Sequence, residues 1–172
     1  FEYKSGSQLT EDGEYVLIFE NYDGYMATYQ FVIDTQCPEL LVEGVKMEGK
    51  TQTNVAVHYT EAELTAKIYK DGVEVGNYAS GTEISETGEY VIRVSDHANN
   101  MSEVTFSIDK VVDYTTNIND KGLANSVTIT ANEEAYVSVL KGETVIDYAF
   151  GNELTEAGRY TVTIEDVLGN TE

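Results

Sequence analysis

A ten-residue phrase occurs three times in this chain and constrains its fold more than any other feature. The copies are GSQLTEDGEY at 6–15, GTEISETGEY at 81–90 and GNELTEAGRY at 151–160. Each contains two glycines, a leucine or isoleucine between them, and a final tyrosine. The copies start 75 and 70 residues apart, which is longer than most solenoid repeats and close to the size of a small domain. This spacing predicts a string of similar modules.

The similarity continues on both sides of the phrase and predicts the module boundaries. The first two copies end alike, with FVID at 31–34 and FSID at 106–109. We therefore expect the C-terminal half of one module over 1–35, a complete module over 36–109, and a module lacking its last strand over 110–172. Because both ends cut through a repeat, we expect the chain to be a segment of a longer protein.

The local pattern is that of strands and turns. Residues 54–59 alternate valine and tyrosine with other residues, the period of a half-buried strand. Asp71-Gly72 separates two alternating segments, which is a strong hairpin signal, and Lys141-Gly142 is its counterpart in the third copy. About seven short strands per module must pack as two sheets around a shared core. The predicted fold class is all-β, with sandwich modules of about 70 residues each.

The glycine and tyrosine that end each phrase predict a structural role. A tyrosine that starts the penultimate strand after a glycine turn fits the tyrosine corner of immunoglobulin-like sandwiches, where its hydroxyl bonds to upstream backbone. The glycine would supply a backbone conformation that other residues resist. The residues assigned to this corner are Gly13, Tyr15, Gly88, Tyr90, Gly158 and Tyr160.

The second copy resembles a known family. The run GTEISETGEYVIRVSDHANNMSEVTFSID is similar to the second half of the bacterial immunoglobulin-like repeats found in tandem in surface and secreted proteins, mostly of Gram-positive bacteria. Asp96, Ala98 and Asn100 match the family's turn after the penultimate strand, whereas Asn99 stands where the family favours glycine. The resemblance implies a spacer, stalk or adhesive unit in an extracellular protein, whose neighbours are modules of the same chain.

The charge excludes several classes of partner. The net charge is −21 from 10 basic and 31 acidic residues, and the acidic excess is spread along all three copies. Such a surface repels phosphate backbones and anionic lipid, so we expect neither nucleic-acid nor membrane binding. The single cysteine, Cys37, cannot form an internal disulfide, which favours a bacterial surface protein over a secreted eukaryotic sandwich.

No catalytic constellation stands out, and we expect no enzyme activity. His58 is predicted on the outward face of a strand and His97 in a turn, neither with a nucleophile or carboxylate partner by spacing. Acidic pairs such as Glu133-Glu134 arise by composition alone in a chain with 31 carboxylates. Metal-binding and nucleotide-binding motifs are lacking. No cofactor is expected, apart from one alternative.

That alternative is calcium, which takes several oxygen ligands. Asp34 and Asp109 end their modules, and a turn expected at the same end of the sandwich holds Asp96, Asn99 and Asn100. The competing interpretation, which we favour, is that these side chains cap turns through backbone hydrogen bonds.

A second alternative is recognition of a host glycan or protein through tyrosines. Tyr22, Tyr25 and Tyr29 lie around a turn of the first copy where the other copies have mainly small or polar residues. Tyrosine offers a large rigid surface with a polar tip, on which sugar rings stack. Packing of Tyr22 and Tyr25 against a neighbouring module is the favoured explanation. The sequence thus predicts a non-enzymatic spacer of a bacterial surface protein, with an adhesive or carbohydrate-binding module, accessory to a secreted glycosidase for instance, as the alternative.

Overall fold

The computed structural model describes residues 3–45, 49–60 and 63–172. These residues form strands and turns and contain no helix, which confirms the predicted all-β class. Within them no helical segment has the length and hydropathy to cross a membrane. The chain divides into two compact units, 1–43 with 56–82 and 90–105, and 44–55 with 83–89 and 106–172. Because both units draw on residues 36–109, the module boundaries stay a prediction.

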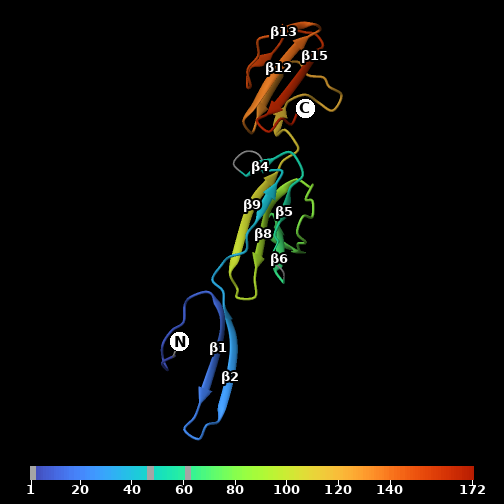
Figure 1. The fold of residues 1–172 in the computed structure, drawn as a ribbon. Coiled ribbons are helices and arrows are strands. Elements are labelled where there is room, and N and C mark those ends of the chain that lie inside the picture. Colours follow the sequence, from blue (N-terminus) through green and yellow to red (C-terminus); the bar gives the residue numbers. More distant parts are fainter. Residues whose placement is uncertain (1–2, 46–48, 61–62) are drawn as a thin grey trace. The chain divides into compact units, whose positions relative to one another are not determined.

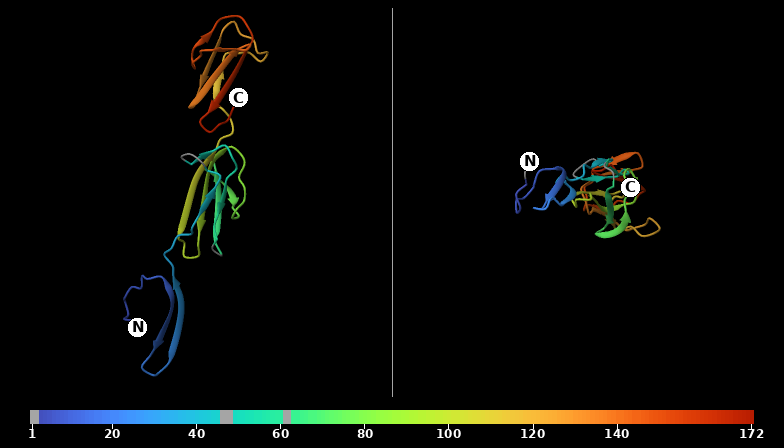
Figure 2. Two further views of the ribbon diagram at one scale, coloured as in Figure 1. Left: turned by 45° about the horizontal axis from the view of Figure 1, so that its top comes forward. Right: turned by 60° about the horizontal axis from the view of Figure 1, so that its bottom comes forward.

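The first hairpin consists of β1 (Gly13–Glu20) and β2 (Met26–Ile33), which lie side by side in Figures 1 and 2. Its register pairs Tyr15 with Phe31, and the two rings stack with centroids 5.4 Å apart. Apolar side chains remain exposed on both faces, Ile18 at 57% and Phe19 at 54%. This hairpin therefore buries little of its own apolar surface.

Residues 41–108 form two sheets. The strands are β3 (Leu41–Glu43), β4 (Lys50–Thr51), β5 (Ala56–His58), β6 (Thr65–Lys70), β7 (Val73–Asn77), β8 (Gly88–Ser95) and β9 (Met101–Ile108). One sheet is β3-β5 and the other has the order β4-β9-β8-β6-β7 (Figure 1). The pairs β3-β5, β6-β7 and β6-β8 are antiparallel, whereas β4-β9 is parallel. The seven strands of the described residues match the number expected for the complete copy.

The core of this region follows the period of two that the sequence showed. Along β8, Tyr90, Ile92 and Val94 are at most 3% exposed, while the residues between them are more exposed. Val57 of β5 is fully buried. Alternation places one face of each strand towards the interior because successive side chains of a strand point to opposite sides.

The two predicted hairpins form, with different turns. Asp71 and Gly72 both have positive φ, 51° and 79°, as a type I′ turn requires. In the third copy Lys141 pairs with Thr144, so the turn residues are Gly142-Glu143, one position later than predicted. Gly142, with φ 62°, takes the first central position, where a type II′ turn needs glycine.

Residues 114–166 form two further sheets, drawn from yellow to red in Figure 2. The strands are β10 (Tyr114–Thr116), β11 (Val127–Ala131), β12 (Ala135–Lys141), β13 (Thr144–Ile146), β14 (Glu153–Leu154) and β15 (Tyr160–Asp166). Their orders are β10-β11-β14 and β13-β12-β15. Ile129, Val139 and Ile164 are at most 2% exposed and form the centre of this core.

Candidate functional site

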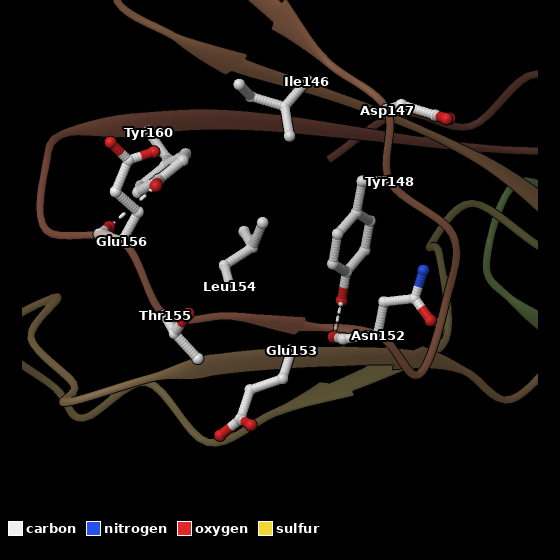
Figure 3. A pocket seen from close by; sticks show the side chains of 9 residues that line it. All are labelled: Ile146, Asp147, Tyr148, Asn152, Glu153, Leu154, Thr155, Glu156 and Tyr160. Carbon is white, nitrogen blue, oxygen red and sulfur yellow. Dashed lines mark hydrogen bonds between the residues drawn. The ribbon is translucent and has the colours of Figure 1, made fainter.

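An open depression of about 420 Å³ lies beside β13, β14 and the turn before β15. In Figure 3 Leu154 projects between the rings of Tyr148 and Tyr160. Both tyrosine hydroxyls are occupied: Tyr148 donates to the Asn152 carbonyl at 2.8 Å and Tyr160 to the Glu156 carbonyl at 2.7 Å. The two tyrosine side chains in its wall are thus held by internal hydrogen bonds.

The carboxylates around this depression do not converge. Asp147 and Glu153 point away from each other in Figure 3. The Glu156 carboxylate lies 3.0 Å from Lys141 Nζ, and that ammonium also stands 5.6 Å from the centroid of the Tyr160 ring. Two carboxylates sharing a reacting atom would have to face one another, so this arrangement builds a turn and not an acid and base pair.

The tyrosines of the predicted corner lie at or near the start of their strands. Tyr15 and Tyr160 each donate a hydrogen bond to the carbonyl four residues upstream, that of Glu11 at 2.9 Å and that of Glu156. Tyr90 is 3% exposed, and Lys70 Nζ lies 5.7 Å from its ring centroid. A lysine over this ring therefore recurs in the second and third copies, a cation–π contact that sequence reasoning missed although Lys70 and Lys141 end equivalent strands.

The glycines of this corner are not all in the conformation predicted. Gly13 and Gly88 have φ of 153°, whereas Gly158 lies outside the positive range that other residues avoid. For Gly158 the expectation is wrong; a Cβ there would come within 2.4 Å of Lys141 Cε, near the far end of a flexible side chain that can move aside. The first glycine of every phrase is the left-handed one, with φ of 86°, 76° and 80° at Gly6, Gly81 and Gly151.

A second set of tyrosines carries more hydrogen bonds than the predicted set. The Tyr78 hydroxyl donates to the Thr82 carbonyl at 2.6 Å and accepts the Val57 N–H at 2.8 Å. Tyr148 makes the same pair of contacts, accepting the Ile129 N–H at 2.9 Å. The sequence signal is a tyrosine three residues before the first glycine of the phrase, but its role depends on a strand about 20 residues away.

The tyrosines predicted as ligand contacts are exposed but are not one cluster. Tyr22 and Tyr25 belong to the turn between β1 and β2 and are 105% and 76% exposed. Tyr29 is 68% exposed and lies on β2 opposite Leu17, four residues beyond Tyr25. Four strand residues span about 13 Å, so only Tyr22 and Tyr25 share the turn.

Four of the five predicted cation ligands, Asp34, Asp96, Asn100 and Asp109, form side-chain hydrogen bonds within the protein. The full predicted set was Asp34, Asp96, Asn99, Asn100 and Asp109. Asp96 Oδ1 accepts the Asn100 N–H at 2.9 Å and Asp96 Oδ2 accepts the Asn100 side-chain amide at 2.8 Å. Asp34 and Asp109 each accept the N–H two residues on, from Gln36 and Val111. In the described part of the chain no three His, Cys, Asp or Glu side chains are arranged to hold a metal ion.

The histidines and the cysteine form no nucleophilic site. His58 Nε2 lies 3.5 Å from a Glu43 carboxylate oxygen, and His97 Nδ1 lies 3.7 Å from one of Glu63. Each histidine thus has a carboxylate nearby, which the sequence spacing did not reveal. Cys37 is exposed and free. Among the described residues, the partners found for the two imidazoles are thus carboxylates, and not the thiol or hydroxyl nucleophiles of covalent catalysis.

Asp12 is a further structural carboxylate, and its titration is our first prediction. Its Oδ1 accepts hydrogen bonds from the Thr35 hydroxyl and N–H at 2.8 and 2.9 Å, and its Oδ2 accepts one from Gln36 Nε2 at 3.2 Å. The bonds from Thr35 and Gln36 lower the pKa of Asp12. Because the folded pKa is depressed, this stabilisation is present above the unfolded value of about 3.9 and is lost as the pH falls through the folded value.

The measurement is an NMR titration of the Asp12 carboxyl carbon and the Thr35 amide. Both signals should change together, with a midpoint below pH of about 3.9. Asp12→Asn should remove the transition from the Thr35 amide. A midpoint at or above the ordinary aspartate value would contradict the hydrogen-bonded carboxylate.

Comparison with known proteins finds similarity to a bacterial cell wall protein. No protein-family model matches the chain. Over 113 residues the chain is 34% identical to a protein named "Outer cell wall protein" of Brevibacillus brevis. The match covers 64% of this chain and 10% of that protein. The chain thus spans about a tenth of the relative's length.

Proposed function

We propose that this chain is a non-enzymatic structural segment of a bacterial cell-surface protein, in which tandem immunoglobulin-like modules act as spacers. The observation that carries the proposal is the 34% identity over 113 residues to an outer cell wall protein. A relative with that name suggests a location at the cell surface. The finer part, tandem immunoglobulin-like modules, rests on the repeated phrase and the family resemblance of the second copy.

The fold and the charge support a structural role. The strands form several separate sheets, and all of them except the β1-β2 hairpin carry buried apolar residues, as β-sandwich modules require. A net charge of −21 keeps such segments soluble and apart from one another. The side chains of Asp12, Asp96 and Tyr78 are engaged in hydrogen bonds within the protein, which supports a structural role.

Immunogold labelling of intact cells that encode the chain tests the location. Antibodies raised against residues 1–172 should label the surface of unpermeabilised cells, and mild extraction of the cell wall should release the antigen. An antibody to a ribosomal protein is the control that the cells are closed. Labelling that appears only after permeabilisation would sink the proposal.

A further inference from the structure

Four turns of the chain share one hydrogen-bonding pattern. Each runs over five residues, 21–25, 96–100, 119–123 and 166–170. The first residue is Asp or Asn, and its Oδ1 accepts the N–H of the fifth. Its own N–H donates to the carbonyl of the fifth, at 3.0 to 3.3 Å. The fourth residue has positive φ in every case, between 69° and 89°. The turn is thus a self-contained unit defined by its first and fourth positions.

The fifth residue differs among these turns, and the turn forms regardless. Tyr25 and Leu123 occupy the fifth position in two of them. Asn100 and Asn170 occupy it in the other two. Since tyrosine and leucine close the same backbone geometry, the asparagine amides are not needed for the turn itself.

Both asparagine amides reach a carbonyl far away in sequence. Asn100 Nδ2 donates to the Asp34 carbonyl at 3.0 Å, across 66 residues. Asn170 Nδ2 donates to the Asp109 carbonyl at 3.1 Å, across 61 residues. Asp34 and Asp109 end the equivalent FVID and FSID strands. Each donor and acceptor lie within one compact unit.

The first residue of the turn holds the amide in place. Asn100 Nδ2 also donates to Asp96 Oδ2 at 2.8 Å, and Asn170 Nδ2 to Asp166 Oδ2 at 2.7 Å. One amide hydrogen therefore goes to the carboxylate and the other to the carbonyl, which uses both donors of the group. The turns with Tyr25 and Leu123 start with Asn21 and Asn119, which lack the second carboxylate oxygen.

The peptide that is held is the start of a linker. The Asp34 carboxylate accepts the Gln36 N–H at 3.0 Å, and Ser102 Oγ donates to the Pro38 carbonyl at 2.5 Å. The linker that leaves β2 is thus bonded at Asp34 by Asn100, at Thr35 and Gln36 by Asp12, and at Pro38 by Ser102. At the second site the donor is well shielded, because Asp166 and Asn170 are 2% and 8% exposed, and hydrogen bonds shielded from water are strong.

We propose that Asp96 with Asn100, and Asp166 with Asn170, are couplers: each turn presents an amide that binds the carbonyl at the end of the preceding sequence repeat and orders the linker there. The coupler makes a spacer stiff without a metal ion or a disulfide. The biological use of this contact rests on the proposed function, because a spacer keeps a fixed length only when its linkers are ordered. The contact itself stands on the hydrogen bonds alone.

The test is the order of the linkers in the full chain, measured by ¹⁵N relaxation. Asn100→Leu copies the natural Leu123 turn and removes only the amide. We expect the order parameters at residues 35–37 to fall below the rigid value of about 0.85, and most at residue 37, because Asp12 still holds Thr35 and Gln36. The amide of residue 100 should stay protected from exchange, because its bond to Asp96 Oδ1 remains. Asn170→Leu should loosen residues 110–112 in the same way and leave 35–37 unchanged.

Two further variants make the result decisive. Tyr25→Leu is the matched control, because this fifth residue bonds to no carbonyl outside its own turn among those described, and both linkers should keep their order. Asp96→Asn, which copies Asn21, should loosen residues 35–37 while the turn persists. If the order parameters of the linkers stay unchanged in both Asn→Leu variants, the proposal is overturned. It is also overturned if the substituted turn loses its amide protection at the same time as the linker loses its order, because the turn itself has then unfolded. Surface labelling is independent of all these outcomes, so a failure of the proposed location is distinguishable from a failure of the coupler.

Discussion

Ile92→Ala is expected to lower the free energy of unfolding of residues 36–109 by about 2–5 kcal/mol, the usual cost of truncating a fully buried isoleucine. Ile92 is 0% exposed on β8, between Tyr90 and Val94, which are also buried. It lies opposite Ile68 of the neighbouring strand β6. The loss combines the transfer of the removed atoms from the core to water with the cavity left among side chains that cannot collapse fully.

The change is measured by urea unfolding, with hydrogen exchange of the β8 amides as the readout. This readout separates the unfolding of residues 36–109 from that of the rest of the chain. Ile18→Ala is the matched control, because the same residue type on β1 is 57% exposed. Its cost should stay within about 0.5 kcal/mol, as for most surface substitutions. Equal effects of the two substitutions would show that Ile92 is not part of a packed core.

The core was predictable because it depends on a local periodicity. Alternation along β8 identified Tyr90, Ile92 and Val94 as one face, and a strand permits only two faces. The hairpin at Asp71-Gly72 was predictable for a similar reason, since the turn type depends on two adjacent residues. In the third copy the same reasoning missed by one residue, because the pairing of Lys141 with Thr144 depends on the register of the strands.

The contacts that join distant segments were not predictable from one sequence. The sequence placed Asp34, Asp96 and Asn100 near one pole, yet two explanations remained open, a cation or turn capping. Which oxygen each amide reaches depends on the position of a carbonyl 66 residues away. Likewise the proximity of Lys141 Cε to Gly158 is a contact between distant residues, which leaves no local signal in the sequence.

Tyr78→Phe is expected to lower the free energy of unfolding by about 1–3 kcal/mol, although it removes a single oxygen. The hydroxyl bridges two backbone groups, the Val57 N–H and the Thr82 carbonyl, at 2.8 and 2.6 Å. Val57 is fully buried, and Tyr78 is 5% exposed. Phenylalanine would leave the Val57 N–H without a partner and without access to water, and an unsatisfied buried donor costs its full desolvation penalty.

Burial raises the pKa of the Tyr78 hydroxyl above its ordinary value, so the group remains a protonated donor throughout the neutral range. The loss of unfolding free energy caused by Tyr78→Phe should therefore be the same from about pH 6 to 8. If the substitution removed a group that titrates in this range, the loss would change with pH. Unfolding in urea at several pH values, with exchange of the Val57 amide as the local readout, provides the measurement.

The comparison variant is Tyr160→Phe, because the Tyr160 hydroxyl donates to the Glu156 carbonyl at an open turn. Its expected cost is about 0.5–1.5 kcal/mol, the net value of an ordinary hydrogen bond, since water can replace the partner. If Tyr78→Phe costs more than Tyr160→Phe, the tyrosine that contributes most to stability is the one three residues before the repeated ten-residue phrase. The hydroxyl of that tyrosine bonds both to the turn and to a neighbouring strand. Equal costs, or a larger cost for Tyr160→Phe, would contradict this and favour the tyrosine that ends the phrase as the more stabilising one.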